Sequence, residues 1–134
     1  MCVSLRRALA FSGVGAPSGD AASEGGSFAA PSLVGVSTNS ANTGYPVPTS
    51  DGLTLFFGSD RSTGSAGAED IWIARRTNLA DGFGPPTNVS ELNTSSQEWP
   101  TSISADGCTL YFASDRGGTG AQGMSDIWMA TRPK

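Results

Sequence analysis

Aspartate is the residue type whose spacing in this sequence most suggests chemistry. Three aspartates in the first half of the chain have counterparts in the second half: Asp51, Asp60 and Asp70, and Asp106, Asp115 and Asp126. Two carboxylates about 5 to 10 Å apart across a cleft can hydrolyse a glycosidic bond, and carboxylates on loops are ligands for Ca²⁺. A catalytic residue is needed once, whereas a residue that maintains a repeated fold is needed in every copy. The recurrence therefore predicts structural roles for these aspartates.

Other acidic side chains do not recur in this way. Glu69, Glu91 and Glu98 are the candidates for a glycosidase pair, but nothing in the sequence brings two of them together. The glycine-rich stretches 62–67 and 117–123 lie between aspartates, and oxygen atoms in such loops could hold Ca²⁺. Solvated turns are the simpler interpretation, so we predict no cofactor and leave Ca²⁺ as the alternative.

The residues that are missing exclude several kinds of enzyme. The chain has no histidine, which removes Ser-His-Asp and Cys-His nucleophile systems and H-E-x-x-H zinc sites. It also has no G-x-S-x-G sequence and no C-x-x-C pair. We therefore predict that the protein is not an enzyme. Cys2 and Cys108 are expected to be free thiols, because Leu53 occupies the position in the first half that corresponds to Cys108.

Charge and hydropathy exclude two classes of partner. The net charge is −4, and the 8 Lys and Arg residues form no basic stripe that would bind a phosphate backbone, so we predict no nucleic-acid binding. No apolar run approaches the roughly 18 residues of a membrane span. Residues 1–27 are rich in Gly, Ala and Ser and are predicted to be a flexible leader or the remnant of a signal segment. A signal segment would place the protein in the periplasm or outside the cell.

The aspartates belong to a repeat that covers most of the chain. The sequence DGLTLFFGSDR at 51–61 returns as DGCTLYFASDR at 106–116, with eight of eleven positions identical. Downstream, EDIWIARR at 69–76 returns as SDIWMATR at 125–132. A period of 55 residues indicates a repeated supersecondary unit, as in solenoids and propellers.

Strands with alternating residue types must position the recurring side chains. The dipeptides Asp51-Gly52 and Asp106-Gly107 predict type I′ turns, with positive φ at both residues, that join antiparallel strands. The strands predicted for the first unit are 45–49, 54–59, 70–75 and 86–92, and those for the second are 99–104, 109–114 and 126–131. Because FAAP at 28–31 matches FGPP at 83–86, a fourth-strand segment is also predicted within 28–37.

The ends of the second strands carry the Asp-Arg pairs. At Asp60-Arg61 and Asp115-Arg116 the aspartate is expected to cap a turn, while the arginine reaches a carbonyl or carboxylate of the neighbouring unit.

Aromatic residues at matching positions predict the core. Trp72 and Trp128 lie in the third strands and are expected to be largely buried between sheets. Neighbours on a strand point to opposite faces, so Phe56 and Tyr111 should share one face and Phe57 and Phe112 the other.

The run S-x-D-G-x-x-L-Y-F-x-S-D-R followed by D-I-W resembles the repeat of TolB-type (WD-40-like, PD40) β-propeller proteins. Residues 102–131 match it closely, whereas the first copy is one residue shorter before Asp51. The resemblance covers residues 28–134 and implies an all-β fold of two four-stranded antiparallel β-propeller blades, a partial propeller. The two repeats lie at about 38–82 and 93–134.

Two functions from different classes follow from the resemblance. TolB-type propellers are similar in holding a partner protein or peptide on a loop-rich face or in a central channel, which implies a non-catalytic binding module. The alternative is a piece of a longer extracytoplasmic protein, whose peptidase or glycosidase domain lies elsewhere. Propellers have about four to eight blades, so we also expect a head-to-tail homo-oligomer in which the segment 28–37 of one copy completes the last blade of another.

Overall fold

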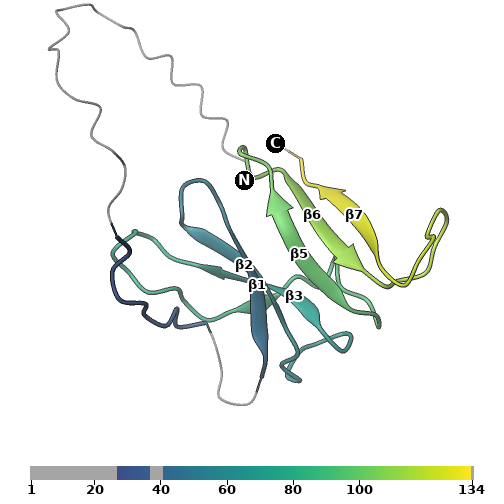
Figure 1. Cartoon of the computed structure of the whole chain (residues 1–134), viewed down its shortest axis with the longest axis horizontal. Helices are drawn as coiled ribbons and strands as arrows, with labels where there is room; N and C mark the ends of the chain where they lie inside the picture. The colour runs from purple at the N-terminus through teal and green to yellow at the C-terminus, as the bar shows by residue number, and fades with distance from the viewer. Residues whose placement is uncertain (1–26, 37–40, 134) are drawn as a thin grey trace, which may run out of the picture.

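The computed structural model describes residues 27–36 and 41–133, and these residues form β-sheets without a helix (Figure 1). The strands are β1 (Thr43–Pro48), β2 (Thr54–Ser59), β3 (Asp70–Arg75), β4 (Thr87–Asn88), β5 (Glu98–Ile103), β6 (Thr109–Ser114) and β7 (Asp126–Thr131). They make a four-stranded antiparallel sheet in the order β1-β2-β3-β4 and a three-stranded one in the order β5-β6-β7. The all-β prediction is confirmed. Nowhere in the described ranges is there a helix long and apolar enough to cross a membrane.

The second and third strands of both units have the bounds that the sequence predicts. β2 and β3 pair without a break in register, from Thr54 opposite Arg75 to Ser59 opposite Asp70, and β6 and β7 pair in the same way. Alternation of residue types fixes this register, because a shift by one residue would move every core side chain to the opposite face.

The first strands, β1 and β5, start slightly earlier than predicted, and each contains an irregularity in its pairing. The register shifts between Gly44 and Val47 in β1 and between Pro100 and Ser102 in β5. Proline has no N–H to donate to a ladder, which confines it to edge strands and bulges. Both β1 and β5 are edge strands of their sheets, and they lie beside one another where the sheets meet.

The fourth strands differ from the prediction. The predicted strand 86–92 is reduced to β4, which pairs with β3, and the second sheet has no fourth strand in the described part of the chain. The described part of the segment 28–37 is not a strand, and Phe28 and Leu33 are 103% and 94% exposed. The segment has no edge to pair with here, because it lies at the opposite side of the molecule from β7 (Figure 1). The leader predicted at 1–27 falls almost entirely outside the described residues.

The turns between the first two strands are not type I′. Only Gly52 has positive φ in the first turn, at 68°, whereas Asp51 does not. The N–H of Gly52 donates to the Thr49 carbonyl at 2.8 Å, and Thr49 and Thr54 close a four-residue loop. Four-residue hairpin loops are often built around a type I turn, and glycine is favoured at its last position. The second hairpin has the same hydrogen bonds among Ser104, Gly107 and Thr109, and Gly107 has φ of 70°.

The core lies mainly between the two sheets. One face of the first sheet supplies Phe56, Ile71 and Ile73, and the opposing face of the second sheet supplies Leu110 and Phe112. In the repeat, Phe112 corresponds to Phe57 and not to Phe56. The sheets therefore pack with one face of the first unit against the opposite face of the second.

A smaller apolar cluster covers the other face of the first sheet. Leu55, Phe57, Trp72 and Ala74 are buried there with Val36. The prediction that Phe56 and Phe57 point to opposite faces is confirmed.

The tryptophan prediction is confirmed in part. Trp72 is buried, but it lies in this smaller cluster rather than between the sheets, because the intersheet face of its strand is occupied by Ile71 and Ile73. Trp128 does pack between the sheets, yet it is only partly buried. The indole N–H groups of both tryptophans have no hydrogen-bond partner.

Candidate functional site

The aspartates of the Asp-Arg pairs join the start of the first strand to the end of the second. Asp60 accepts hydrogen bonds from the backbone N–H and the side-chain amide of Asn42, at 2.7 and 2.6 Å. Asp115 accepts a hydrogen bond from the backbone N–H of Gln97 at 2.8 Å. Each aspartate thus joins two strand ends that are 18 residues apart in the chain, rather than capping its own turn as predicted.

The aspartates that open the third strands organise the preceding glycine-rich loops. Asp70 is fully buried and accepts hydrogen bonds from the N–H groups of Ala66 and Gly67 and from the Asn88 amide. Asp126 accepts one from the N–H of Gln122. Each carboxylate therefore accepts backbone N–H groups of the loop before its strand, as aspartates in turns commonly do.

The aspartates of the hairpins stabilise their own turns. Asp51 accepts the Thr49 hydroxyl at 2.6 Å and the Leu53 N–H at 2.9 Å. These hydrogen bonds favour the charged carboxylate, and they hold the pKa of Asp51 below its ordinary value, the Thr49 hydroxyl having the larger effect. Asp106 makes the corresponding contacts with Ser104 and Cys108.

Arg61 and Arg116 each reach a backbone carbonyl of the segment that precedes their own unit. Arg61 donates to the Val36 carbonyl at 2.9 Å, and Arg116 donates to the Leu92 carbonyl at 2.5 Å. Each guanidinium also lies over two aromatic rings of its own sheet: Phe57 and Trp72 for Arg61, and Phe112 and Trp128 for Arg116. Burial lowers the pKa of Arg61 from its ordinary value.

A second pair of arginines also recurs in the repeat, but no role was predicted for them. The guanidinium groups of Arg76 and Arg132 donate to the carbonyls of Gly52 and Gly107, at 2.9 and 3.0 Å. Both arginines lie six residues after the aspartate that opens a third strand. This recurrent spacing was the signal that could have identified them.

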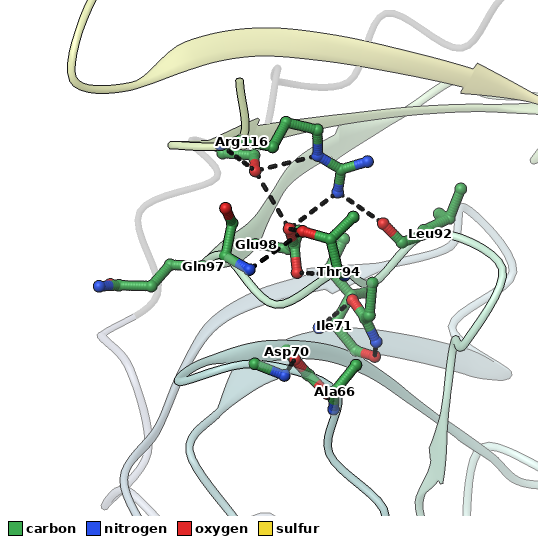
Figure 2. Close-up of polar contacts among 12 residues, drawn as sticks. Ala66, Asp70, Ile71, Leu92, Thr94, Gln97, Glu98 and Arg116 are labelled. Carbon is green, nitrogen blue, oxygen red and sulfur yellow. Dashed lines mark hydrogen bonds and ion pairs between the residues drawn. The ribbon is translucent and has the colours of Figure 1, made fainter. Parts of the chain in front are cut away.

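Glu98 is the carboxylate that sets the second unit apart. It is fully buried, and it accepts hydrogen bonds from the N–H and hydroxyl of Thr94 and from the Ser114 hydroxyl. Arg116 forms an ion pair with it at 3.0 Å (Figure 2). Thr43 stands at the corresponding place beside Ser59 in the first sheet. Glu98 is therefore a paired structural charge at the junction between the units.

The other two candidate glutamates have different surroundings. Glu69 accepts a hydrogen bond from the Trp99 indole at 2.5 Å, and Glu91 is exposed at the rim of a separate cleft. No group of three or more His, Cys, Asp or Glu residues that could hold a metal ion occurs within 27–36 and 41–133. The aspartates flanking the glycine-rich loops bind backbone or amide N–H groups, so the structure provides no support for a Ca²⁺ site there.

A cleft of about 260 Å³ opens between the two sheets. Its floor is apolar, with Phe56 and Ile73 on the first sheet and Ile103 and Leu110 on the second. Polar and charged side chains line its rim: Arg75, Thr87, Glu91 and Arg132. Binding sites for small ligands and peptide side chains commonly combine an apolar floor with a few polar groups, so this cleft is the candidate binding site.

Cys108 lies beside the cleft and is not a free thiol. It is disulfide-bonded, and the described residues include no free cysteine. The expectation was wrong for Cys108 because it relied on the repeat, and a bond to a residue outside the repeat leaves no periodic signal. The partner of Cys108, and the expectation for Cys2, lie outside the described residues.

Comparison with known proteins identifies no relative. No protein-family model matches the chain, and neither a curated protein nor a solved structure matches it.

Proposed function

We propose that the protein is a non-catalytic repeat module of the TolB-type β-propeller kind that binds a peptide or small ligand in the intersheet cleft. The observation that supports this proposal is the cleft itself, with its apolar floor and its rim of polar and charged side chains. The recurring aspartates are engaged in turns and strand ends, which leaves the cleft as the better surface for recognition. The stacking of one face of the first sheet on the opposite face of the second is the arrangement expected of consecutive blades.

An extracytoplasmic location is part of the same proposal. Disulfides form and persist in oxidising compartments such as the periplasm and the cell exterior, and Cys108 is disulfide-bonded. Fractionation of producing cells, with thiol labelling of the protein before and after reduction, tests this location. Labelling of the unreduced protein at Cys108 in a cytoplasmic fraction would contradict it.

Selection from a random peptide display library tests binding at the cleft. We expect enriched peptides, and we expect their affinity for the Thr87→Glu variant to fall at least tenfold, because the new carboxylate stands at the rim. Thr119→Glu is the matched control, since Thr119 is an exposed threonine in the loop at the other end of β6 and should leave the affinity unchanged. Peptides that bind both variants equally, or no enrichment at all, would overturn the proposal.

A further inference from the structure

The outer edge of β7 has no neighbouring strand among the described residues, whereas the corresponding edge of β3 is covered by β4. One face of β6 and β7 is also uncovered. Tyr111, Ile127 and Met129 are 39%, 69% and 60% exposed, while their counterparts Phe56, Ile71 and Ile73 are buried at 5%, 0% and 7%. Among the described residues, the β7 edge of the second sheet and its Tyr111 face are therefore uncovered, whereas the equivalent edge and face of the first sheet are buried.

The first sheet shows what covers such an edge. In β4, Asn88 lies opposite Trp72 and Thr87 opposite Ile73. The N–H of Val89 then donates to the Ile71 carbonyl at 3.0 Å, and the Val89 side chain is buried in the intersheet cluster with Ile71 and Ile73. A short extended segment ending in valine is enough to complete the sheet.

The chain contains a second segment of this kind. Residues 31–34 (PSLV) correspond to residues 86–89 (PTNV). Both segments lead into a tight turn, with the N–H of Val36 donating to the Val34 carbonyl and that of Leu92 to the Val89 carbonyl. At the ends of these turns, the Val36 carbonyl accepts a hydrogen bond from Arg61 and the Leu92 carbonyl accepts one from Arg116. The segment 31–34 is thus anchored to the first sheet as its counterpart is anchored to the second.

The apolar side chains of this segment are uncovered in the single chain. Leu33 is 94% exposed and Val34 is 49% exposed. The segment and β7 lie at opposite sides of the molecule (Figure 1), so the two uncovered surfaces do not meet within this fold.

We propose that residues 32–34 of one copy form the fourth strand of the β5-β6-β7 sheet of a second copy. The repeat fixes the register, with Ser32 opposite Met129, Leu33 opposite Trp128 and Val34 opposite Ile127. The N–H of Val34 donates to the Ile127 carbonyl, as Val89 does to Ile71, and the Val34 side chain covers Ile127. This self-association does not depend on what the intersheet cleft binds.

The contact has two physical consequences. It is heterologous, since a segment on one side of a copy binds an edge on the other side of the next, and such contacts continue into rings or filaments. It should also be weaker than the contact within the chain. Leu33 takes the place of Asn88 and has no amide to donate to Asp126, whereas Asn88 donates to Asp70 at 2.7 Å. The affinity rests on backbone hydrogen bonds and apolar burial.

Sedimentation velocity of the full chain over a range of concentrations tests the proposal. We expect the average mass of the wild type to rise with concentration. We expect Val34→Lys, in the donor segment, and Ile127→Lys with Met129→Lys, on the acceptor edge, each to weaken association at least tenfold. Met124→Lys is the matched control, because Met124 is 92% exposed in the loop before β7, and it should associate like the wild type.

Mixing the two defective proteins distinguishes this contact from any other. The Val34→Lys protein retains its acceptor edge, and the Ile127→Lys, Met129→Lys protein retains its donor segment. The mixture should form a heterodimer and nothing larger. A wild type that stays monomeric up to its solubility limit, or a mixture that stays monomeric while the wild type associates, would overturn the proposal. Circular dichroism of each variant confirms that its sheets are intact.

Discussion

At the scale of single residues, Arg61 and Arg116 occupy the same place in the two units, but in the described part of the chain only Arg116 forms an ion pair. Arg61 holds a carbonyl and lies over two aromatic rings, whereas Arg116 does the same and also neutralises the buried Glu98. Removing one partner of a buried ion pair costs about 3 to 5 kcal/mol, because the other charge is left without compensation. The two arginines should therefore differ in their contribution to stability.

We expect Arg116→Ala to lower the free energy of unfolding by about 3 kcal/mol or more. Arg61→Ala is the matched control and should cost about 1 to 3 kcal/mol, since it removes a hydrogen bond to a carbonyl and the contacts with Phe57 and Trp72. Urea unfolding followed by circular dichroism measures both. If Glu98→Gln combined with Arg116→Ala were no more stable than Arg116→Ala alone, the buried charge would not be the cause.

Asp51 should have a pKa below the ordinary value for aspartate. Its pKa is lowered first by the Thr49 hydroxyl and then by the Leu53 N–H. A carboxyl whose pKa is lower in the folded state stabilises the fold above its unfolded pKa of about 3.9, and this contribution is lost as the pH falls through the lower, folded value. The chemical shift of the Asp51 carboxyl carbon, measured by NMR against pH, should give a pKa below the ordinary aspartate value.

The Thr49→Val variant tests the cause of that shift. It removes the hydroxyl that donates to Asp51, so the pKa of Asp51 should move back toward its ordinary value. An Asp51 titration that is identical in the two proteins would show that the hydroxyl does not set the pKa.

At the scale of elements, sequence predicted best what depends on neighbours in the chain. The bounds of β2, β3, β6 and β7 follow from alternating residue types within six residues. The fourth strands could not be predicted in this way, because a segment such as 31–34 becomes a strand only where an unpaired edge lies within reach. The turn type was mistaken for a different, local reason: the Asp51 carboxylate accepts the Leu53 N–H without positive φ at Asp51.

The glycine-rich loops look alike in sequence but differ in how closely they approach other backbone. A methyl group on Gly67 would overlap the Ser96 carbonyl oxygen and lie 2.6 Å from that of Thr94. At the corresponding Gly123, the nearest atom would be an ordinary 3.7 Å away. The loop before β3 is therefore pressed against the segment that leads into β5, and the loop before β7 is not.

We expect Gly67→Ala to destabilise the protein by about 1 to 3 kcal/mol or more, because backbone must move to make room. Gly123→Ala should change the free energy of unfolding by less than about 0.5 kcal/mol. Thermal or urea unfolding of the two variants gives the comparison. Equal effects would mean that the loops are packed alike.

At the scale of the whole molecule, one apolar cluster is shared by the two sheets. Phe56 comes from the first sheet, Phe112 and Leu110 come from the second, and all are buried together. The two sheets should therefore unfold in a single cooperative step. The sequence predicted on which face of its own strand each aromatic residue lies. It did not predict which faces of the two sheets would meet, because that depends on how the segment from β4 to β5 orients the second sheet.

We expect Phe112→Ala to cost about 3 to 5 kcal/mol and to raise amide hydrogen exchange in β2 and β3 as much as in β6 and β7. Tyr111→Ala is the control on the opposite, exposed face of the same strand, and it should change exchange little. Faster exchange confined to the second sheet would show that the sheets unfold independently.

The stacking of unlike faces gives the molecule a polarity. If the sheets had met through equivalent faces, the pair would be symmetric and complete. Because they meet through opposite faces, the outer face of the first unit is the one that carries Phe57, the counterpart of Phe112. The outer face of the second unit is the one that carries Tyr111, the counterpart of Phe56. A third unit placed between them by duplication of the gene segment would find a matching surface on each side. The architecture can therefore lengthen one repeat at a time without the evolution of a new interface.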